Sequence, residues 1–254
     1  MTLISKGHLP LADHAFGASV AGPAHVAARV GNQDAWTCTH WPSEHGTVYC
    51  AVVCDGLGSR LHARDGARAG VRAAKQAARQ WSRAPGAPTG LLVRLLEVLW
   101  RLEVAPLPPD DCAATCLVAL AVPDGSGRRL VLLALGDGLA AAETQQGLQS
   151  VGGRAEAEFS NTTAALGTPH HMNDWQVLDL RPSGRVRVLL LSDGIADDVS
   201  AQRVPDLLTW LAGLEGRPAA ARGQTLRRAL RQWPVPGHSD DKTVVYLHIG
   251  GVGV

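Results

Sequence analysis

Strand-like and helical segments are grouped along this chain of 254 residues instead of alternating. β-Branched and apolar runs predict strands, and apolar residues at helical spacing predict helices. The predicted strands cover residues 47–54, 113–122, 129–135, 185–192 and 243–249, and the predicted helices cover 66–81, 90–104, 204–214 and 219–233. The βαβ units of a doubly wound parallel sheet would alternate strand and helix. We therefore expect an α+β domain, a sandwich of two sheets flanked by helices.

Composition and charge narrow the class of protein. No linker or internal repeat divides the chain, so we expect one domain over residues 1–254, and apolar residues make up 46% of it, enough for a sizeable core. The 24 Lys and Arg residues balance 23 Asp and Glu residues, which gives no support for a nucleic-acid or membrane-surface partner. Neither a signal peptide nor a bilayer-spanning apolar run is visible, so we expect a cytoplasmic protein.

Five cysteines include two pairs, Cys50 with Cys54 and Cys112 with Cys116, each spaced by four residues. One interpretation is a zinc site with four thiolates. Structural zinc sites, however, place their paired ligands in loops, and these pairs lie in apolar, strand-like runs. We favour small buried thiols in a reducing compartment.

Carboxylates stand at the ends of the predicted strands. Apolar runs end at Asp55, Asp137 and Asp193, each followed by Gly, and the pair Asp240-Asp241 precedes the last strand. Asp is disfavoured within strands, but at a strand end its short side chain is held by a rigid scaffold. The adjacent Gly lets the chain turn sharply and lets a ligand approach.

Asp-Gly is also an ordinary turn signal. A hairpin turn should lead directly into a returning strand, whereas the segments after Asp55 and Asp193 lead into predicted helices. The turn explanation therefore fails for these two residues and stays open for Asp137. Gathered carboxylates repel one another and need cations or protons. Oxygen ligands without clustered His or Cys favour hard ions, Mg²⁺ or Mn²⁺.

Five short motifs follow one another along the chain: RVGNQD at 29–34, VVCDGLG at 52–58, LGDG at 135–138, LLSDGI at 190–195 and SDDKTVV at 239–245. Each alone is weak, but in this order and spacing they resemble the motifs of the PPM family of metal-dependent serine/threonine phosphatases, also called protein phosphatase type 2C, and in particular its compact bacterial branch. The resemblance covers about residues 17–249. It implies a four-layer α-β-β-α sandwich of two antiparallel sheets flanked by helices.

The resemblance also implies a metal centre with two Mn²⁺ or Mg²⁺ ions. Asp55 would bridge both metals, and the Gly56 carbonyl would bind the second. Asp193 and Asp240 would bind the first. Asp137 stands where many bacterial members bind a third, looser metal. A water shared by the two metals would become a hydroxide that attacks the phosphorus in line.

Two further residues acquire roles from the resemblance. Asp34 would act through metal-bound water, and Arg29, five residues before it, would hold the substrate phosphate with its planar fork of donors. Leu57 stands where some relatives carry a His proposed as the general acid. His25 and His62 are close in sequence to these motifs, but each is more often a surface or core histidine than an acid.

The resemblance predicts hydrolysis of phosphoserine and phosphothreonine in proteins. Phosphorylated substrates, a cognate serine/threonine kinase or the targets of that kinase would be the partners in bacterial signalling, and a monomer is expected. The segment within 138–185 is short, so the flap that shapes substrate choice is expected to be reduced. Two alternatives are a phosphatase-like binding module without turnover and a hydrolase of small phosphoesters.

Overall fold

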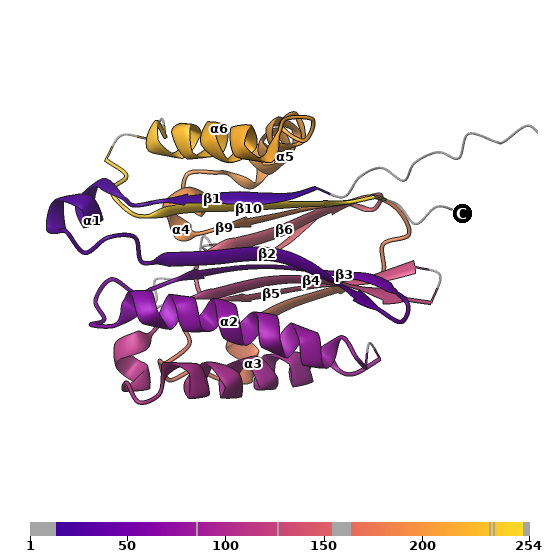
Figure 1. Cartoon of the computed structure of the whole chain (residues 1–254), viewed down its shortest axis with the longest axis horizontal. Helices are drawn as coiled ribbons and strands as arrows, with labels where there is room; N and C mark the ends of the chain where they lie inside the picture. The colour runs from indigo at the N-terminus through magenta and orange to yellow at the C-terminus, as the bar shows by residue number, and fades with distance from the viewer. Residues whose placement is uncertain are drawn as a thin grey trace, which may run out of the picture.

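The computed structural model describes residues 14–84, 86–125, 127–153, 164–233, 235 and 237–250. Two five-stranded antiparallel sheets lie face to face in the middle of the molecule (Figure 1). The first sheet has the strand order β1-β10-β9-β6-β7. Its strands are β1 (His14–Val20), β6 (Leu139–Thr144), β7 (Gly147–Gly152), β9 (Val186–Leu191) and β10 (Lys242–Ile249).

The second sheet has the strand order β2-β3-β4-β5-β8. Its strands are β2 (Asp34–Ser43), β3 (Gly46–Asp55), β4 (Cys116–Asp124), β5 (Gly127–Leu135) and β8 (Gln176–Leu180). Every pair of neighbours in both sheets is antiparallel. Apolar side chains from both inner faces form a continuous core between the sheets.

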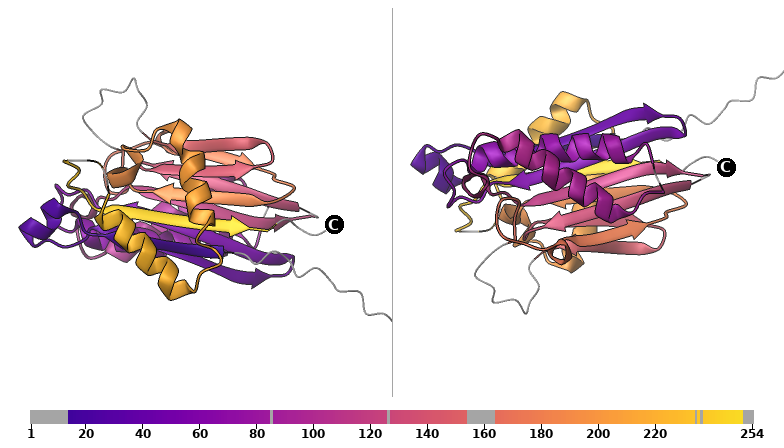
Figure 2. Two further views of the ribbon diagram at one scale, coloured as in Figure 1. Left: turned by 90° about the horizontal axis from the view of Figure 1, so that it is seen from above. Right: turned by 90° about the horizontal axis from the view of Figure 1, so that it is seen from below.

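Helices cover the outer face of each sheet (Figures 1 and 2). Over the second sheet lie α2 (Ala63–Trp81) and α3 (Thr89–Val104), and over the first lie α5 (Val204–Ala212) and α6 (Ala219–Arg231). Shorter pieces are α1 (Pro23–Ala28), α4 (Asp193–Ala196) and the 3₁₀ turns η1 (Pro109–Cys112), η2 (Met172–Asp174) and η3 (Ala201–Arg203). A separate apolar cluster fills each helix–sheet interface. The predicted four-layer α+β sandwich is therefore confirmed.

Close packing of α2 against the second sheet depends on small residues. A Cβ atom added to Gly70 would lie 2.7 Å from Cys54 Sγ, and one added to Gly66 would lie 1.6 Å from the Cys112 carbonyl oxygen. Only glycine permits these approaches. The inner face of α2 is buried while its Arg and Lys residues face outward. This close packing fixes how far the outward-facing Arg and Lys residues of α2 lie from β2 and β3.

The cysteines behave as expected of buried thiols. Four of the five are buried, and Cys38 is half-buried. Burial raises the pKa of the Cys38 thiol to about 12, and that of Cys50 is raised as well, again chiefly by burial. At neutral pH such thiols stay protonated, and among the described residues no three cysteines lie close enough together to hold one metal ion.

Several strands were missed by the sequence prediction, namely β1, β2, β6, β7 and β8. The region 138–185, expected to hold a reduced flap, contains β6 and β7 of one sheet and β8 of the other. Within it, residues 154–163 lie outside the described part of the chain, so a reduced flap stays a prediction. Among the described residues, no helix is long and apolar enough to cross a bilayer.

Candidate metal centre

Two carboxylates meet where β2 begins and β3 ends. Asp34 and Asp55 are direct cross-strand partners in the second sheet. β3 is buried from Val48 to Cys54, and Asp55 therefore leaves the core at the edge of the sandwich. Gly56 follows, and a Cβ atom there would lie 2.4 Å from the Ala63 carbonyl oxygen. The glycine predicted beside Asp55 is thus required by the close approach of the chain that starts α2.

Two more carboxylates come from the first sheet. Asp193 follows β9 as the first residue of α4, and Asp240 precedes β10. β9 and β10 are antiparallel neighbours, so the end of one lies beside the start of the other. A Cβ atom on Gly194 would lie 1.9 Å from the Asp241 carbonyl oxygen, so these two connections are packed backbone against backbone.

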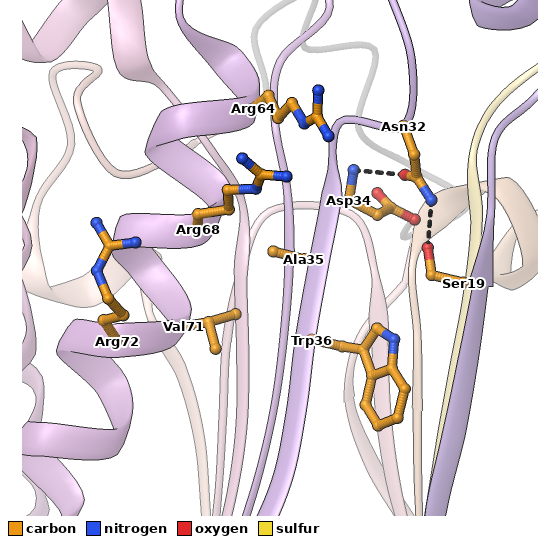
Figure 3. Close-up of a pocket in the computed structure, with 9 residues that line it drawn as sticks. All are labelled: Ser19, Asn32, Asp34, Ala35, Trp36, Arg64, Arg68, Val71 and Arg72. Carbon is orange, nitrogen blue, oxygen red and sulfur yellow. Dashed lines mark hydrogen bonds between the residues drawn. The ribbon is translucent and has the colours of Figure 1, made fainter.

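Asp34 joins the two sheets through one of its carboxylate oxygens. Asp34 Oδ2 accepts hydrogen bonds from Ser192 Oγ at 3.0 Å and Thr243 Oγ1 at 2.6 Å. Ser192 and Thr243 flank the metal-ligand candidates of the first sheet. On the other side, the Asp34 backbone N–H donates to Asn32 Oδ1 at 2.9 Å, and Asn32 Nδ2 donates to Ser19 Oγ at 2.6 Å (Figure 3). The Asp34 carboxylate is therefore fixed in orientation.

The carboxylates perturb one another strongly. Burial raises the pKa of Asp34 to about 7, although hydrogen bonds from neighbouring hydroxyls oppose the shift. Burial also raises the pKa of Asp55, and the charges of Asp34, Asp193 and Asp240 add to the effect. The pKa of Asp193 is raised by burial and by the charges of Asp137 and Asp240. Without cations, the cluster can persist at neutral pH only by holding protons.

These residues fit a divalent cation. Asp34 Oδ1 and Asp193 Oδ1 are buried, and no N–H or hydroxyl donor of the described residues reaches them. Buried polar atoms without donors carry a free-energy cost that a cation would remove. Carboxylate oxygens with available backbone carbonyls are the ligands that Mg²⁺ and Mn²⁺ prefer.

Asp241 has a structural position that the sequence did not predict. Its side chain is fully buried, and its two oxygens accept backbone N–H groups of Gly22 at 2.7 Å and Gln33 at 2.6 Å. His25 Nδ1 lies 2.9 Å from Asp241 Oδ2. Through these hydrogen bonds, Asp241 anchors the segment that contains α1 to the start of β10. Ligand atoms of His25, Asp240 and Asp241 lie within 4.8 Å of one another, so the imidazole also borders the cluster.

The remaining predicted residues lie as follows. Asp137 lies on the crossover from β5 to β6, which connects the two sheets, so the open question of an ordinary hairpin turn is answered in the negative. A Cβ atom on the adjacent Gly138 would lie 2.8 Å from the Leu191 carbonyl oxygen, so Asp137 lies near the end of β9, and its charge raises the pKa of Asp193. Arg29 ends α1 in a left-handed conformation (φ 57°), and its side chain is exposed. Its role in holding phosphate stays a prediction.

Ser192, Thr243 and His25 were missed as members of the site. Ser192 and Thr243 occur inside the quoted motifs, so their positions, one residue before Asp193 and two residues after Asp241, were the available signal. His25 was considered because it is close in sequence to the motifs, but it was given no role, since its approach to the cluster depends on the path of the chain through α1.

Comparison with known proteins gives the family. The model of the family described as protein phosphatase 2C matches residues 21–233. A sequence search among characterised proteins found no significant match. Solved structures with a similar fold include PppA, a key regulatory component of T6SS in Pseudomonas aeruginosa, with a TM-score of 0.61, 16% identity and coverage of 94% of this chain and 98% of that chain.

Two similar structures contain metals. The catalytic domain of the serine/threonine protein phosphatase PstP, in complex with two manganese ions, has a TM-score of 0.55 and 20% identity, covering 92% of this chain and 97% of that chain. RsbX in complex with magnesium has a TM-score of 0.55 and 12% identity, covering 93% of this chain and 94% of that chain. At these identities the likeness concerns the fold. Since the family model spans most of the sequence, the chain belongs to the protein phosphatase 2C family.

Proposed function

We propose that this chain hydrolyses phosphoserine and phosphothreonine in proteins with the help of two divalent cations, Mn²⁺ or Mg²⁺. The observation that carries the proposal is the convergence of Asp34, Asp55, Asp193 and Asp240 from both sheets, with buried oxygens that lack donors. Family membership and the manganese and magnesium in similar structures support the choice of ions.

Asp55, Asp193 and Asp240, together with the Gly56 carbonyl, would hold the pair of cations, and Asp137 would hold a third. Bound there, the cations would supply an acidified water nucleophile and positive charge for the phosphoryl oxygens. Ser192 and Thr243 occupy Asp34 Oδ2, which leaves Oδ1 available to orient water or accept a proton. Arg29 would bind the phosphate from the exposed end of α1.

The partners follow from this activity. Substrates would be phosphorylated proteins, and the family resemblance favours a serine/threonine kinase or its targets. The two alternatives, a binding module without turnover and a hydrolase of small phosphoesters, are outcomes of the same experiments.

The test is hydrolysis of para-nitrophenyl phosphate and of a phosphothreonine peptide with Mn²⁺, with and without EDTA. Asp55→Asn and Asp193→Asn should each lower kcat/KM by about a hundredfold or more, because each removes a charged ligand. The matched control is Asp206→Asn, an exposed carboxylate on α5 that pairs with Arg203, and its activity should match the wild type. Activity that survives EDTA and both substitutions would contradict the proposal. Turnover of nucleotides or sugar phosphates but not of phosphopeptides would favour the small-molecule alternative.

A further inference from the structure

A groove runs between α2 and the start of β2 (Figure 3). Its cavity has a volume of about 450 Å³. One wall is made by Arg64, Arg68 and Arg72 of α2. The spacing of four residues puts the three guanidinium groups on one face of the helix. The opposite wall includes Asn32 and Asp34.

Two of these arginines have no partner among the residues that the structure describes. Within the described part of the chain, neither Arg64 nor Arg68 makes a hydrogen bond or ion pair, and both are exposed. Arg72 differs, since its Nε lies 2.6 Å from Glu103 Oε2. α2 as a whole carries five basic residues and one acidic residue, Asp65. The positive charges of Arg64 and Arg68 are therefore not paired with any residue that the structure describes.

The groove opens at the carboxylate cluster. Asp34, which lines it, is the cross-strand partner of Asp55. Arg64 reaches the loop before Asp34, because a Cβ atom on Gly31 would lie 3.8 Å from its Nη1. A molecule whose phosphate lies at the cluster could therefore extend along α2 without a break.

We infer that this groove is a second anion-binding subsite, which holds a carboxylate or phosphate side chain of the peptide whose phosphoserine or phosphothreonine lies at the carboxylate cluster. The inference rests on the proposed function and names its substrate class: phosphopeptides with acidic or further phosphorylated residues near the scissile group. Arginine suits this task because its fork of donors matches both kinds of oxyanion.

The dimensions limit the spacing of the two anions. Arg64 and Arg72 are separated by about 12 Å along the helix axis, which corresponds to roughly four residues of extended peptide. An anion bound at Arg72 should therefore lie about four residues further along the peptide than one bound at Arg64. The near-neutral net charge of +1 gives no support for a nucleic acid as the occupant.

The experiment compares the wild type with Arg64→Gln, Arg68→Gln and the double variant. Arg101→Gln, an exposed position on α3, is the control for loss of one positive charge. Three phosphothreonine peptides serve as anionic substrates: one has Asp residues before the phosphothreonine, one has Asp residues after it, and one has a second phosphothreonine. A phosphothreonine peptide with Asn in place of Asp and para-nitrophenyl phosphate are the reference substrates. All reactions contain Mn²⁺. Binding is measured in parallel by fluorescence anisotropy of the labelled peptides.

The wild type should prefer an acidic or doubly phosphorylated peptide over the Asn peptide. The double variant should raise KM for that peptide by about tenfold, with kcat and the hydrolysis of para-nitrophenyl phosphate changed less than about twofold. Comparing the Asp peptides with the doubly phosphorylated one shows which anion the groove prefers, and Arg101→Gln should match the wild type.

Three results would overturn the inference. The wild type could show no preference for acidic peptides. The double variant could lose activity toward para-nitrophenyl phosphate as strongly as toward peptides, which would give the arginines a role at the scissile phosphate or in folding. A single-stranded oligonucleotide could compete as well as the acidic peptide, which would indicate unselective binding of polyanions. Arginine-dependent binding without any turnover would support the groove while the proposed function fails.

Discussion

Asp34, the first residue of β2, lies directly opposite Asp55, the last residue of β3. The register of β2 against β3 makes the two carboxylates neighbours, and this does not depend on the conformation of the surrounding loops. The pKa of Asp34 is raised from 3.8 to about 7, chiefly by burial. The folded protein therefore binds this proton more tightly than the unfolded chain does.

The metal-free protein should lose stability as the pH rises. A raised carboxyl pKa contributes stability that is fully present below pH 3.8 and is lost as the pH rises through about 7. In EDTA, we expect the melting temperature to fall between about pH 4 and 7, by on the order of 5 °C more in the wild type than in Asp34→Asn. Saturating Mn²⁺ should abolish this difference, because cations replace the protons. Differential scanning fluorimetry over this range measures it, and an equal slope in the variant would assign the effect to another group.

Asp240 and Asp241 should give opposite results although they are adjacent. Asp241→Ala leaves the buried N–H groups of Gly22 and Gln33 without an acceptor, so we expect a loss of about 3 kcal/mol in unfolding free energy. Asp240→Ala should cost less than about 1 kcal/mol because that side chain is half-buried. It should instead weaken Mn²⁺ binding by at least about tenfold, since it removes a charged ligand.

Urea denaturation in EDTA and calorimetric titration with Mn²⁺ separate the two effects. If Asp240→Ala destabilised the metal-free protein as much as Asp241→Ala, the division between a metal ligand and a structural anchor would be wrong.

The positions of Asp55 and Asp193 were predictable because the sequence pattern that marks each of them lies within a few neighbouring residues. Each ends an apolar run and is followed by Gly and then a helix, a pattern that ordinary hairpin turns do not produce. The position of Asp241 was not predictable in this way. Its partners, Gly22 and Gln33, are 219 and 208 residues away. Such a contact follows from the path of the chain around α1, which leaves no periodic signal.

The missed strands have a similar explanation. β6 contains three consecutive alanines, Ala140 to Ala142, and alanine is depleted in strands. β2 contains Pro42 and several polar residues, and most of its side chains are only half-buried, so it lacks a clear alternation. Both are strands because of the neighbours they pair with. The meeting of the two sheets at the carboxylate cluster depends on their stacking, which periodicity within one strand does not encode.

Gly194 should tolerate no side chain. A Cβ atom there would lie 1.9 Å from the Asp241 carbonyl oxygen, which is backbone and cannot rotate away. Gly194→Ala should therefore cost about 2 kcal/mol or more and displace Asp193, with weaker Mn²⁺ binding as the second effect. Gly216→Ala is the matched control because nothing lies within 4 Å of the added Cβ atom. Its stability should stay within about 0.5 kcal/mol of the wild type. Equal stability of the two variants, measured by urea denaturation, would refute the close approach.

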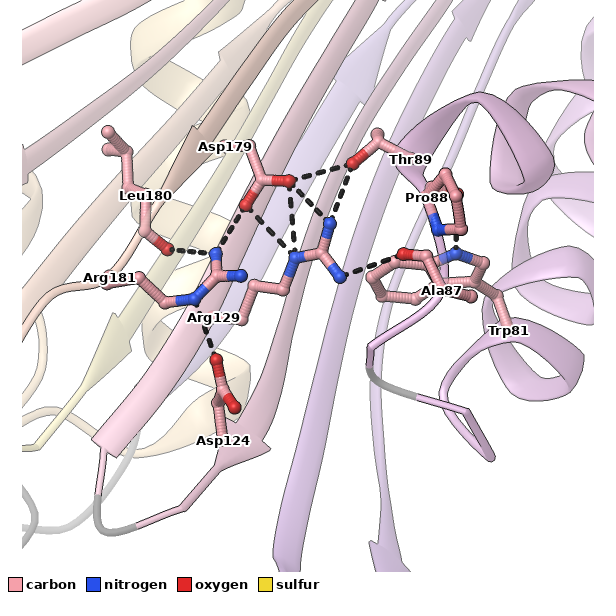
Figure 4. A network of polar contacts seen from close by, with 9 residues as sticks. All are labelled: Trp81, Ala87, Pro88, Thr89, Asp124, Arg129, Asp179, Leu180 and Arg181. Atoms are coloured by element: carbon pink, nitrogen blue, oxygen red, sulfur yellow. Dashed lines mark hydrogen bonds and ion pairs between the residues drawn. The ribbon is translucent and has the colours of Figure 1, made fainter.

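Arg129 should be needed for stability and dispensable for catalysis. Its guanidinium donates to both oxygens of Asp179, to the Ala87 carbonyl at 2.9 Å and to Thr89 Oγ1 at 3.0 Å, and it lies 4.7 Å from the ring centroid of Trp81 (Figure 4). These contacts join the edge of the second sheet to the connection between α2 and α3. The side chain is buried, with 5% of its surface exposed.

Burial alone would raise the pKa of Asp179, but hydrogen bonds from Arg129, Thr89 and Arg181 outweigh it and lower the pKa to about 2. The stability from this carboxylate is therefore present above pH 3.8 and lost as the pH falls through about 2. Arg129→Lys keeps the charge but loses the planar fork of donors. We expect a loss of about 2 kcal/mol for Lys and about 3 kcal/mol for Ala at neutral pH, and a smaller difference from the wild type below pH 4.

Arg129 lies near the start of β5, whereas Asp137 follows the end of that strand. The six residue steps along β5 from Arg129 to Leu135 place it about 20 Å from the end of the strand that leads to the metal centre. We therefore expect Arg129→Lys to leave kcat/KM for para-nitrophenyl phosphate within about twofold of the wild type at 25 °C. Urea denaturation and steady-state kinetics on the same preparation test both halves. A large loss of kcat/KM in a fully folded variant would mean that the packing of α2 and α3 against the sheet controls the geometry of Asp34 and Asp55 as well.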